Sequence, residues 1–209
     1  MAEVEGSKGR GYHHGDLRRA LVEAAAAILA EAGVDALTLR GVGDRVGVSR
    51  TALYRHFDSK AALLAAVATE GFRSFRRALE AALQAAPADA GARIAALGRA
   101  YVAFGAEHPT YYRTMFATPI TGKDHDPDLA AEGRAAFGVL VAAIAEGQAA
   151  GRFGPGDPVR LAQVFWAAVH GVVQLTDSGR IDGPVDGPKG GPPLADLVSA
   201  MLLTGLEVR

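Results

Sequence analysis

Arginine, threonine and tyrosine side chains lie close together in the short segment SRTALYRHF, residues 49–57. If this segment is helical, with about 100° between successive residues, Leu53 and Phe57 share one apolar face. The opposite face then carries four polar side chains, Arg50, Thr51, Tyr54 and Arg55. Arginine can bond a guanine edge through two hydrogen bonds, and a threonine methyl can contact thymine. The chemistry available on this face is therefore recognition of a nucleic-acid groove.

The local charge around this face supports the same chemistry, although the whole chain carries a net charge of only −1. Between residues 45 and 60 the single acidic residue is Asp58. Four basic residues accompany it, Arg45, Arg50, Arg55 and Lys60. For a surface that binds phosphates, local clustering of charge matters more than the total.

Each polar residue of this segment also has a structural interpretation. Arg50 and Arg55 could be ordinary solvated charges, and Tyr54 could cover the edge of the core. His56 could contact a phosphate or form a local hydrogen bond. A purely structural helical protein, however, would not need the polar face between residues 50 and 55.

A second group of chemically capable residues lies in the C-terminal half. Trp166 and His170 are four residues apart, so they share one face of a predicted helix. They could form a core pair in which His170 is hydrogen-bonded. Alternatively, His170 could be a polar anchor in a cavity for a flat or apolar small molecule. That cavity would be lined by Tyr101, Phe104, Tyr111, Tyr112, Met115, Phe116, Phe137, Trp166 and His170.

Metal-binding patterns are weak in this sequence. The chain has no cysteine, which excludes disulfides, thiolate zinc sites and a cysteine nucleophile. The segment YHHGD contains His13, His14 and Asp16, which could be metal ligands, part of an arm near DNA, or a helix cap. Because adjacent histidines at the head of a helix rarely converge on one ion, we expect neither a metal nor a cofactor.

Catalytic patterns are also missing. The sequence contains no HExxH pattern, phosphate loop or nucleophile elbow. We therefore expect no enzymatic activity. A helical enzyme that uses His170 with a nearby carboxylate is the distant alternative.

The elements that must position these residues are predicted to be helices throughout. Hydrophobic residues make up 49% of the chain, and no run alternates as a half-buried strand would, so we predict an all-α fold. Residues 1–11 are polar and glycine-rich, which is typical of a flexible arm. Asp16 can begin the first helix and Gly33 can end it. Further helices are predicted from Thr38, from Ser49, from Ser59 to near Pro87, and at 89–107, 109–117, 127–150, 158–177 and 194–207.

The second and third of these helices predict a helix-turn-helix motif. Gly47 separates them by a tight turn, and Ser49 can cap the second one. In this motif the second helix enters the major groove of DNA. Gly41 and Gly43 weaken the first helix by up to about 1 kcal/mol each, so its packing must stabilise it.

The pattern LTLR followed by DRVGVSRTALYRHFDSKAALL, residues 37–40 and 44–64, resembles the DNA-binding domain of the TetR (tetracycline repressor) family. The resemblance covers about the first 65 residues. It implies an all-α homodimer with a helix-turn-helix domain, residues 12–65, and a ligand-binding and dimerisation domain, residues 66–209. It also implies that Thr38 and Lys60 contact phosphates. The recognition helix would carry Arg50, Thr51, Tyr54 and His56.

Two later segments resemble a TetR C-terminal subfamily named for its Trp, His and Gly. The segments are HPTYYRTMF, residues 108–116, and FWAAVHGVVQL, residues 165–175. The three named residues would be Trp166, His170 and Gly171. This resemblance is shorter and less specific than that of the N-terminal segment.

These observations predict a ligand-responsive transcriptional regulator of double-stranded operator DNA. The leading hypothesis is a repressor that a small, largely apolar or aromatic ligand releases from a pseudo-palindromic operator. An activator or a ligand-independent regulator is the alternative. We expect a cytoplasmic homodimer with no membrane segment, because the most apolar stretch is shorter than the roughly 20 residues that cross a bilayer. The dimer interface is predicted to include Val164, Val172, Leu197, Met201 and Leu202.

Overall fold

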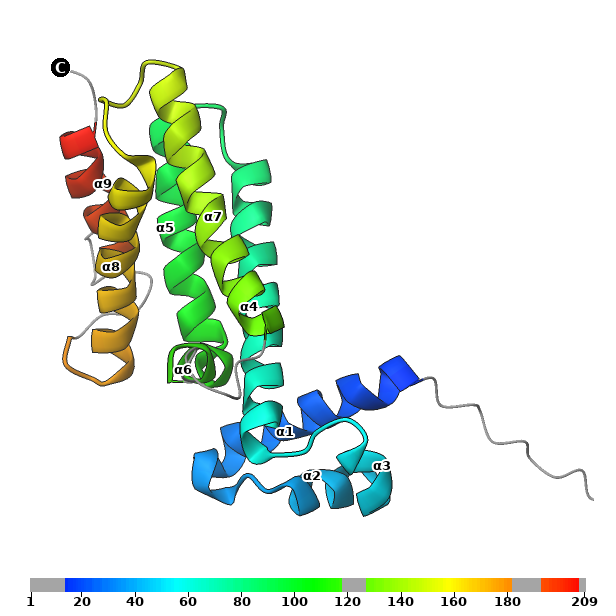
Figure 1. The fold of residues 1–209 in the computed structure, drawn as a ribbon. Coiled ribbons are helices and arrows are strands. Elements are labelled where there is room, and N and C mark those ends of the chain that lie inside the picture. The colour runs from blue at the N-terminus through cyan, green and yellow to red at the C-terminus, as the bar shows by residue number, and fades with distance from the viewer. Residues whose placement is uncertain (1–13, 118–126, 182–192, 207–209) are drawn as a thin grey trace, which may run out of the picture. The chain divides into compact units, whose positions relative to one another are not determined.

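The computed structural model describes residues 14–117, 127–181 and 193–206, with side chains described from Leu17 onward. Every regular element in these ranges is a helix, and Figure 1 labels the helices. The helices are α1 (His14–Ala36), α2 (Leu39–Val46), α3 (Arg50–Tyr54), α4 (Lys60–Ala85), α5 (Ala90–Glu107), α6 (Pro109–Ala117), α7 (Pro127–Ala149), α8 (Pro158–Asp177) and α9 (Leu194–Leu206). The all-α prediction is confirmed.

The chain divides into two compact units, residues 1–64 and 65–209. The N-terminal unit contains α1, α2, α3 and the first residues of α4. The C-terminal unit contains the remainder of α4 and all later helices. Among the described residues, no helix is long and apolar enough to cross a membrane.

The N-terminal unit is held together by a small apolar core. Its largest fully buried side chains are those of Leu21, Leu37, Val42, Leu53 and Leu63. They come from α1, from the segment before α2, from α2 and α3, and from the first turn of α4. The short helices α2 and α3 therefore depend on this shared core, since helices of this length are not stable alone.

In the C-terminal unit, α5 is the central helix. It packs against α6, α7, α8 and α9, and Figure 1 shows α4, α5 and α7 running alongside one another. Glycine permits two of these close approaches. A Cβ atom at Gly105 would overlap the side chain of Val173, and one at Gly98 would overlap that of Ser199. Both α8 and α9 can therefore approach the backbone of α5.

Most predicted helix boundaries are confirmed to within one or two residues. Gly33, with φ 75° and ψ −177°, interrupts the helical backbone of α1 where the sequence predicted its end. The first helix begins at His14, two residues before the predicted cap Asp16. The predicted arm, residues 1–11, lies outside the described residues.

The predicted length of the third helix is wrong. We expected RTALYRHF, residues 50–57, to be one helix capped by Ser49, but α3 ends at Tyr54. The amide nitrogens of His56 and Phe57 both donate to the carbonyl oxygen of Leu53, which closes a turn instead of extending the helix. Phe57 still reaches the core, at 3% exposure, from this turn.

Candidate nucleic-acid interface and ligand pockets

Local hydrogen bonds set the ends of α2 and α3. The Thr38 hydroxyl oxygen accepts from the Gly41 amide at 3.0 Å, and the Ser49 hydroxyl oxygen accepts from the Ala52 amide at 3.2 Å. Such a cap stabilises a helix by about 1 kcal/mol. Gly47, at φ 75°, adopts the left-handed conformation between the two helices. Together these residues build the predicted helix-turn-helix.

Gly43 allows α3 to lie close to α2. It is buried, and a Cβ atom there would lie 3.3 Å from the Leu53 side chain and 3.7 Å from the Val48 carbonyl oxygen. The expected weakness of this glycine in an isolated helix is therefore offset by the packing that it permits. A groove of about 370 Å³ remains between the helices and is lined by Leu39, Arg40, Gly43, Asp44, Val48, Arg50, Leu53 and Tyr54.

The structure brings three of the predicted DNA-contacting residues onto one exposed face of α3. Arg50, Thr51 and Tyr54 are exposed, whereas Leu53 is buried on the other side. The Arg50 guanidinium lies 5.2 Å from the centroid of the Tyr54 ring, within the range of a cation–π contact. This contact holds the arginine next to the tyrosine and leaves its N–H donors available.

Arg55 and His56 are placed differently from the prediction. Both lie in the turn after α3, not on the helix. Arg55 is exposed and follows Tyr54 directly, so it stays at the edge of the face. His56 is half-buried. The recognition helix is thus shorter than predicted, and these two residues follow it in the turn.

Two of the four clustered cations already have partners. The Arg45 guanidinium donates to both carboxylate oxygens of Glu31, at 2.7 and 2.6 Å, and this pair lowers the pKa of Glu31. The Lys60 ammonium donates to the Val34 carbonyl oxygen. Arg45 therefore joins α2 to α1, and Lys60 has only part of its donor capacity left for a phosphate.

In the C-terminal unit, three polar groups from distant parts of the chain meet. Nδ1 of His170 lies 2.7 Å from the Tyr112 hydroxyl oxygen and 3.1 Å from that of Tyr101, and the two hydroxyl oxygens are 3.2 Å apart. We call these three residues the Tyr–Tyr–His cluster. Burial raises the pKa of both tyrosines and lowers the pKa of His170. All three groups are therefore uncharged near neutral pH.

The predicted aromatic cavity is only partly present. A pocket of about 330 Å³, here called the aromatic pocket, is lined by Phe116, Phe137, Gln163, Trp166, Ala167 and His170. Four of these residues were predicted. The other five predicted residues do not line it, because Tyr101, Phe104, Tyr112 and Met115 are buried in the packed core and Tyr111 packs against that core.

The packed part of the aromatic cluster supports the pocket. The Phe75 ring contacts both Tyr101 and Trp166 edge to face, with centroids 4.9 and 5.7 Å apart. On the pocket side, Phe137 lies 5.4 Å from Trp166, and Phe116 lies 4.5 Å from His170, between ring centroids. Edge-to-face pairs of this kind fix the ring positions. The walls of the pocket are therefore preformed.

Sequence reasoning missed Gln163 and Ala167, although a signal was available. With Trp166 and His170 they occupy positions i, i+3, i+4 and i+7 on α8, which is one helix face. Extending the predicted Trp–His face by one turn would have found both residues.

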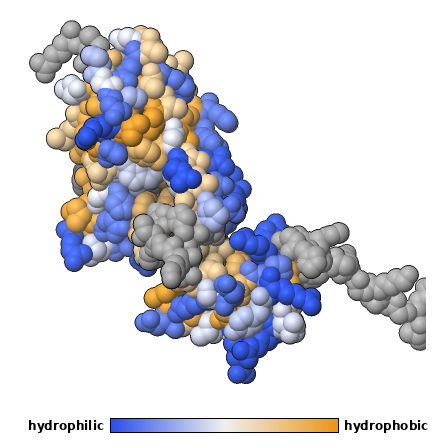
Figure 2. All heavy atoms as spheres, viewed as in Figure 1, coloured by the Kyte–Doolittle hydropathy of each residue, from blue (hydrophilic) through white to orange (hydrophobic). Residues whose placement is uncertain are grey.

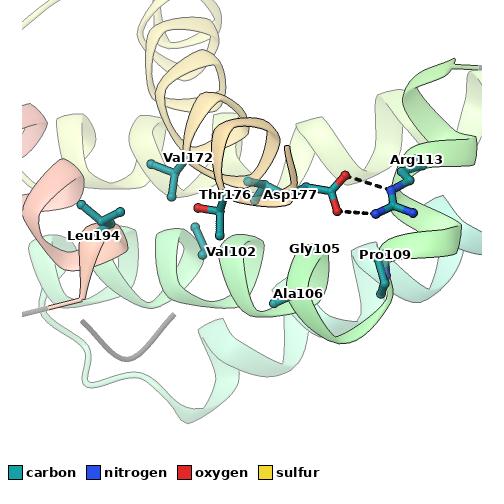
Figure 3. A pocket seen from close by; sticks show the side chains of 10 residues that line it. Val102, Gly105, Ala106, Pro109, Arg113, Val172, Thr176, Asp177 and Leu194 are labelled. Carbon is teal, nitrogen blue, oxygen red and sulfur yellow. Dashed lines mark hydrogen bonds and ion pairs between the residues drawn. The ribbon is translucent and has the colours of Figure 1, made fainter. Parts of the chain in front are cut away.

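A second pocket in this unit was not predicted. It measures about 340 Å³ and lies among α5, α6, α8 and α9 (Figure 3). At one side Arg113 donates two hydrogen bonds to Asp177, at 2.9 and 2.6 Å, and the pair lowers the pKa of Asp177. Figure 3 shows Val102, Val172 and Leu194 as apolar neighbours. Arg113 and Asp177 are 64 residues apart, so no local pattern indicated their pairing.

No group of three or more His, Asp or Glu side chains in the described part of the chain is arranged to hold a metal ion. The side chains of His13, His14 and Asp16 lie outside the described residues.

Comparisons with known proteins agree with the N-terminal geometry. Residues 21–67 match the family model of the bacterial regulatory proteins of the tetR family, and residues 94–190 match that of a Tetracyclin repressor-like C-terminal domain. The chain belongs to the TetR family. A 48-residue segment is 50% identical to the class A tetracycline repressor protein from transposon 1721 of Escherichia coli. It covers 23% of this chain and 22% of that repressor.

Two solved structures extend this comparison over nearly the whole TetR-family chain. A protein of unknown function from Rhodococcus sp. RHA1 is 36% identical, with a TM-score of 0.82 over 96% of this chain and 100% of that one. A TetR family transcription regulator from Marinobacter aquaeolei VT8 shares the fold at 20% identity, with a TM-score of 0.69 over 92% of this chain and 96% of that one.

The predicted dimer surface of this TetR-family chain is exposed at three positions. Val164, Leu197 and Met201 are 58%, 44% and 77% exposed. Leu202 is half-buried against the core of its own protomer. Val172 is only 9% exposed, so its prediction as free apolar surface is wrong, because it already packs within the unit. Figure 2 shows that hydrophobic residues reach the visible face of the C-terminal unit.

Proposed function

We propose that the protein is a transcriptional repressor that binds a pseudo-palindromic operator and that a small molecule releases it. The observation that carries the proposal is the exposed Arg50–Thr51–Tyr54 face on a capped helix-turn-helix. Family membership adds the expectation that this helix lies in the major groove. Arg50 would bond a base edge, while Thr38, Arg55, His56 and Lys60 would position the protein on the phosphate backbone.

Selection of bound sequences from a random duplex library tests this function. We expect an enriched palindrome whose half-sites are one helical turn apart, about 34–36 Å between centres. Binding that is equally tight for all duplexes would reject sequence-specific regulation. A reporter gene placed behind the recovered operator then separates repression from the alternative, activation.

The operator proposal requires two protomers, and α8 and α9 offer the surface that joins them. Val164 and Leu175 lie eleven residues apart on the same face of α8, and Gly171 lies between them on that face. A Cβ atom at Gly171 would meet nothing within 4 Å. Leu197 and Met201 continue the apolar surface on α9. These residues would pack against their equivalents in a two-fold dimer.

Light scattering tests the dimer. We expect a dimer at micromolar concentration and a shift towards monomer when Met201→Glu places a charge in the apolar surface. Arg180→Glu, which places a charge at an exposed position outside this surface, is the matched control. A monomeric unmodified protein would reject this interface and the two-protomer operator complex with it.

The C-terminal unit would bind the releasing ligand in the aromatic pocket. Apolar ring walls with the polar tips of His170 and Gln163 suit a small, largely aromatic compound. The ligand must bind the released state of the dimer more tightly than the DNA-bound state, since equal affinity shifts nothing. Trp166 is the single tryptophan of the chain and lines this pocket, so its fluorescence would report occupancy.

The assignment to the Trp-His-Gly subfamily is a finer prediction within this proposal. It rests on Trp166 and His170 in the aromatic pocket and on Gly171 at the outer face of α8.

A ligand-independent regulator is the alternative to ligand-induced release. An operator affinity that no pocket-binding compound changes would favour this alternative. Measurement of operator affinity by fluorescence anisotropy with each compound that binds separates the two.

A further inference from the structure

The Tyr–Tyr–His cluster determines which nitrogen of His170 carries the proton. Burial keeps both phenols protonated and the imidazole neutral. Each hydroxyl has one proton to donate, and a neutral imidazole has one nitrogen that donates and one that accepts. Neutral His170 can adopt two tautomers, and the number of satisfied hydrogen-bond donors in the cluster differs between them.

If Nδ1 accepts, both hydroxyl protons are used inside the cluster. One tyrosine donates to Nδ1 and the other donates to the first tyrosine's oxygen, which the three distances of 2.7, 3.1 and 3.2 Å allow. If Nδ1 instead carries the proton, it can donate to a tyrosine oxygen, but then the two phenols have only each other as acceptors, and two hydroxyls cannot donate to each other at once. One buried phenol would then be left without an acceptor.

That unsatisfied phenol would be costly. Tyr101 and Tyr112 are 3% and 2% exposed, and the described residues offer the Tyr101 hydroxyl no hydrogen-bond partner beyond Tyr112 and His170. A buried donor without an acceptor is disfavoured strongly enough to make one tautomer dominant. Nδ1 is therefore the acceptor, and Nε2 carries the proton.

The protonated nitrogen is the one that the Tyr–Tyr–His cluster leaves unbonded. His170 lines the aromatic pocket, and the two nitrogens of an imidazole point in widely different directions from the ring. Nδ1 faces the tyrosines, whereas Nε2 has no hydrogen-bond partner among the described residues. The lining of the aromatic pocket thus combines apolar ring walls and the Gln163 amide with His170, whose Nε2–H is free to donate.

We propose that the aromatic pocket selects a flat aromatic compound with a hydrogen-bond acceptor, such as a carbonyl oxygen, that receives the Nε2 proton of His170. Tyr101 and Tyr112 are positioning residues that fix the tautomer without touching the ligand. This proposal deepens the ligand site of the proposed function and rests on it. The pocket beside Arg113 and Asp177 differs, because the polar groups at its side are an ion pair and not a neutral donor among aromatic rings.

The tautomer can be tested in the unmodified protein by ¹⁵N NMR of the imidazole nitrogens. We expect Nδ1 of His170 to give a pyridine-type signal and Nε2 a pyrrole-type signal. In the Tyr101→Phe/Tyr112→Phe variant, both signals should move towards averaged positions. The reverse assignment in the unmodified protein would overturn the proposal.

The ligand class can be tested with two compounds of matched shape. In 2-isopropenylnaphthalene a CH₂ group replaces the carbonyl oxygen of 2-acetylnaphthalene. By calorimetry we expect 2-acetylnaphthalene to bind about five- to tenfold more tightly, as one added hydrogen bond implies. In His170→Phe, which keeps an aromatic ring but removes the donor, the two affinities should become equal.

The outcomes separate this inference from the proposed function. Equal affinities in the unmodified protein, or no binding of either compound, would overturn the inference. If 2-acetylnaphthalene binds selectively but leaves operator affinity unchanged, the result supports His170 as a hydrogen-bond donor to the ligand. It rejects release from the operator by a ligand in this pocket. If His170→Phe does not fold, the NMR assignment and the compound pair in the unmodified protein still decide.

Discussion

The α3 face and the Tyr–Tyr–His cluster place polar groups by opposite means. On α3 the polar side chains are exposed, and the helix that carries them begins at Ser49, whose hydroxyl oxygen accepts from the amide three residues later in the chain. In the cluster the polar groups are largely covered, and they come from three helices, α5, α6 and α8. The first surface can adapt to a long, charged partner. The second fixes its groups before any ligand arrives.

The largest expected effect follows from the packing beneath α3. Gly43→Leu should push α3 away from α2, because even a Cβ atom there lies 3.3 Å from Leu53. We expect the free energy of unfolding to fall by about 1–3 kcal/mol, and specific operator binding to be lost. Chemical denaturation and fluorescence anisotropy measure the two effects.

Gly138→Leu is the control, since a Cβ atom at Gly138 in α7 meets nothing within 4 Å. It should leave operator binding unchanged. Unaltered binding in Gly43→Leu would show that the α2–α3 packing does not position the recognition face.

The next effect concerns the base contact proposed for Arg50. Arg50→Ala should weaken binding to the preferred operator by about 1–3 kcal/mol and relax specificity at one base position. It should not change the free energy of unfolding appreciably, because Arg50 is exposed. Arg134→Ala, which removes an exposed arginine from α7, is the matched control. Unchanged affinity and preference in Arg50→Ala, measured by anisotropy, would remove this residue from the interface.

A smaller effect, confined to stability, is expected in the cluster. Tyr112→Phe removes a buried hydroxyl that lies 2.7 Å from Nδ1 of His170, while the Tyr101 hydroxyl stays within reach of that nitrogen. We expect a loss of about 1 kcal/mol in the free energy of unfolding, with operator affinity unchanged in the absence of ligand. Tyr54→Phe removes an exposed hydroxyl from α3. It should leave the free energy of unfolding unchanged and weaken operator binding. If both variants behave alike, the contrast between the two regions is wrong.

The same contrast explains which features the sequence could predict. The caps, the left-handed Gly47 and the alternation of Arg50, Thr51 and Tyr54 around Leu53 are local patterns, so the helix-turn-helix could be predicted from residues a few positions apart. The end of α3 at Tyr54 could not, because RTALYRHF has no helix breaker before Phe57. Only the turn closed on the Leu53 carbonyl oxygen ends the helix.

In the C-terminal unit, helix periodicity predicted the elements but not the pocket. Whether a ring fills the core or lines a cavity depends on how helices pack, and periodicity is the same in both cases. Tyr101 and Tyr112 were predicted to line the cavity, but they lie in the core, where their hydroxyls hydrogen-bond to Nδ1 of His170. The Arg113–Asp177 pair joins α6 to the end of α8. Because the two residues are 64 positions apart in the chain, no local sequence pattern predicts their pairing.

Cations beside the α3 face offer a finer comparison. Lys60→Ala should weaken binding to all duplexes similarly and reduce the slope of log affinity against log salt by up to about one unit. Arg45→Ala should leave that slope unchanged, because the Arg45 charge is already paired with Glu31. Anisotropy titrations at several salt concentrations measure both slopes. Equal slopes for Lys60→Ala and the unmodified protein would mean that the bond to the Val34 carbonyl is the role of Lys60.

The smallest effect is the pH dependence that His170 gives to stability. Its pKa is lowered by burial, so the unfolded chain binds a proton more readily than the folded one. The stability that neutral His170 contributes is therefore complete above the ordinary histidine pKa of about 6.5 and is lost as the pH falls through the folded pKa. The facing phenols of Tyr101 and Tyr112 stay neutral in this range. Asp177, whose pKa Arg113 lowers, stays ionised.

Denaturation midpoints between pH 7.5 and 5 measure this dependence. We expect the free energy of unfolding to fall with pH in the unmodified protein, and less steeply in His170→Phe, with His108→Phe as the control for a histidine outside the cluster. Only the difference between the slopes matters, since His170→Phe also changes packing. A slope in His170→Phe as steep as that of the unmodified protein would show that His170 accepts a proton as readily in the fold as in the unfolded chain. The cluster would then not hold the imidazole neutral, and its contrast with the solvated α3 face would disappear.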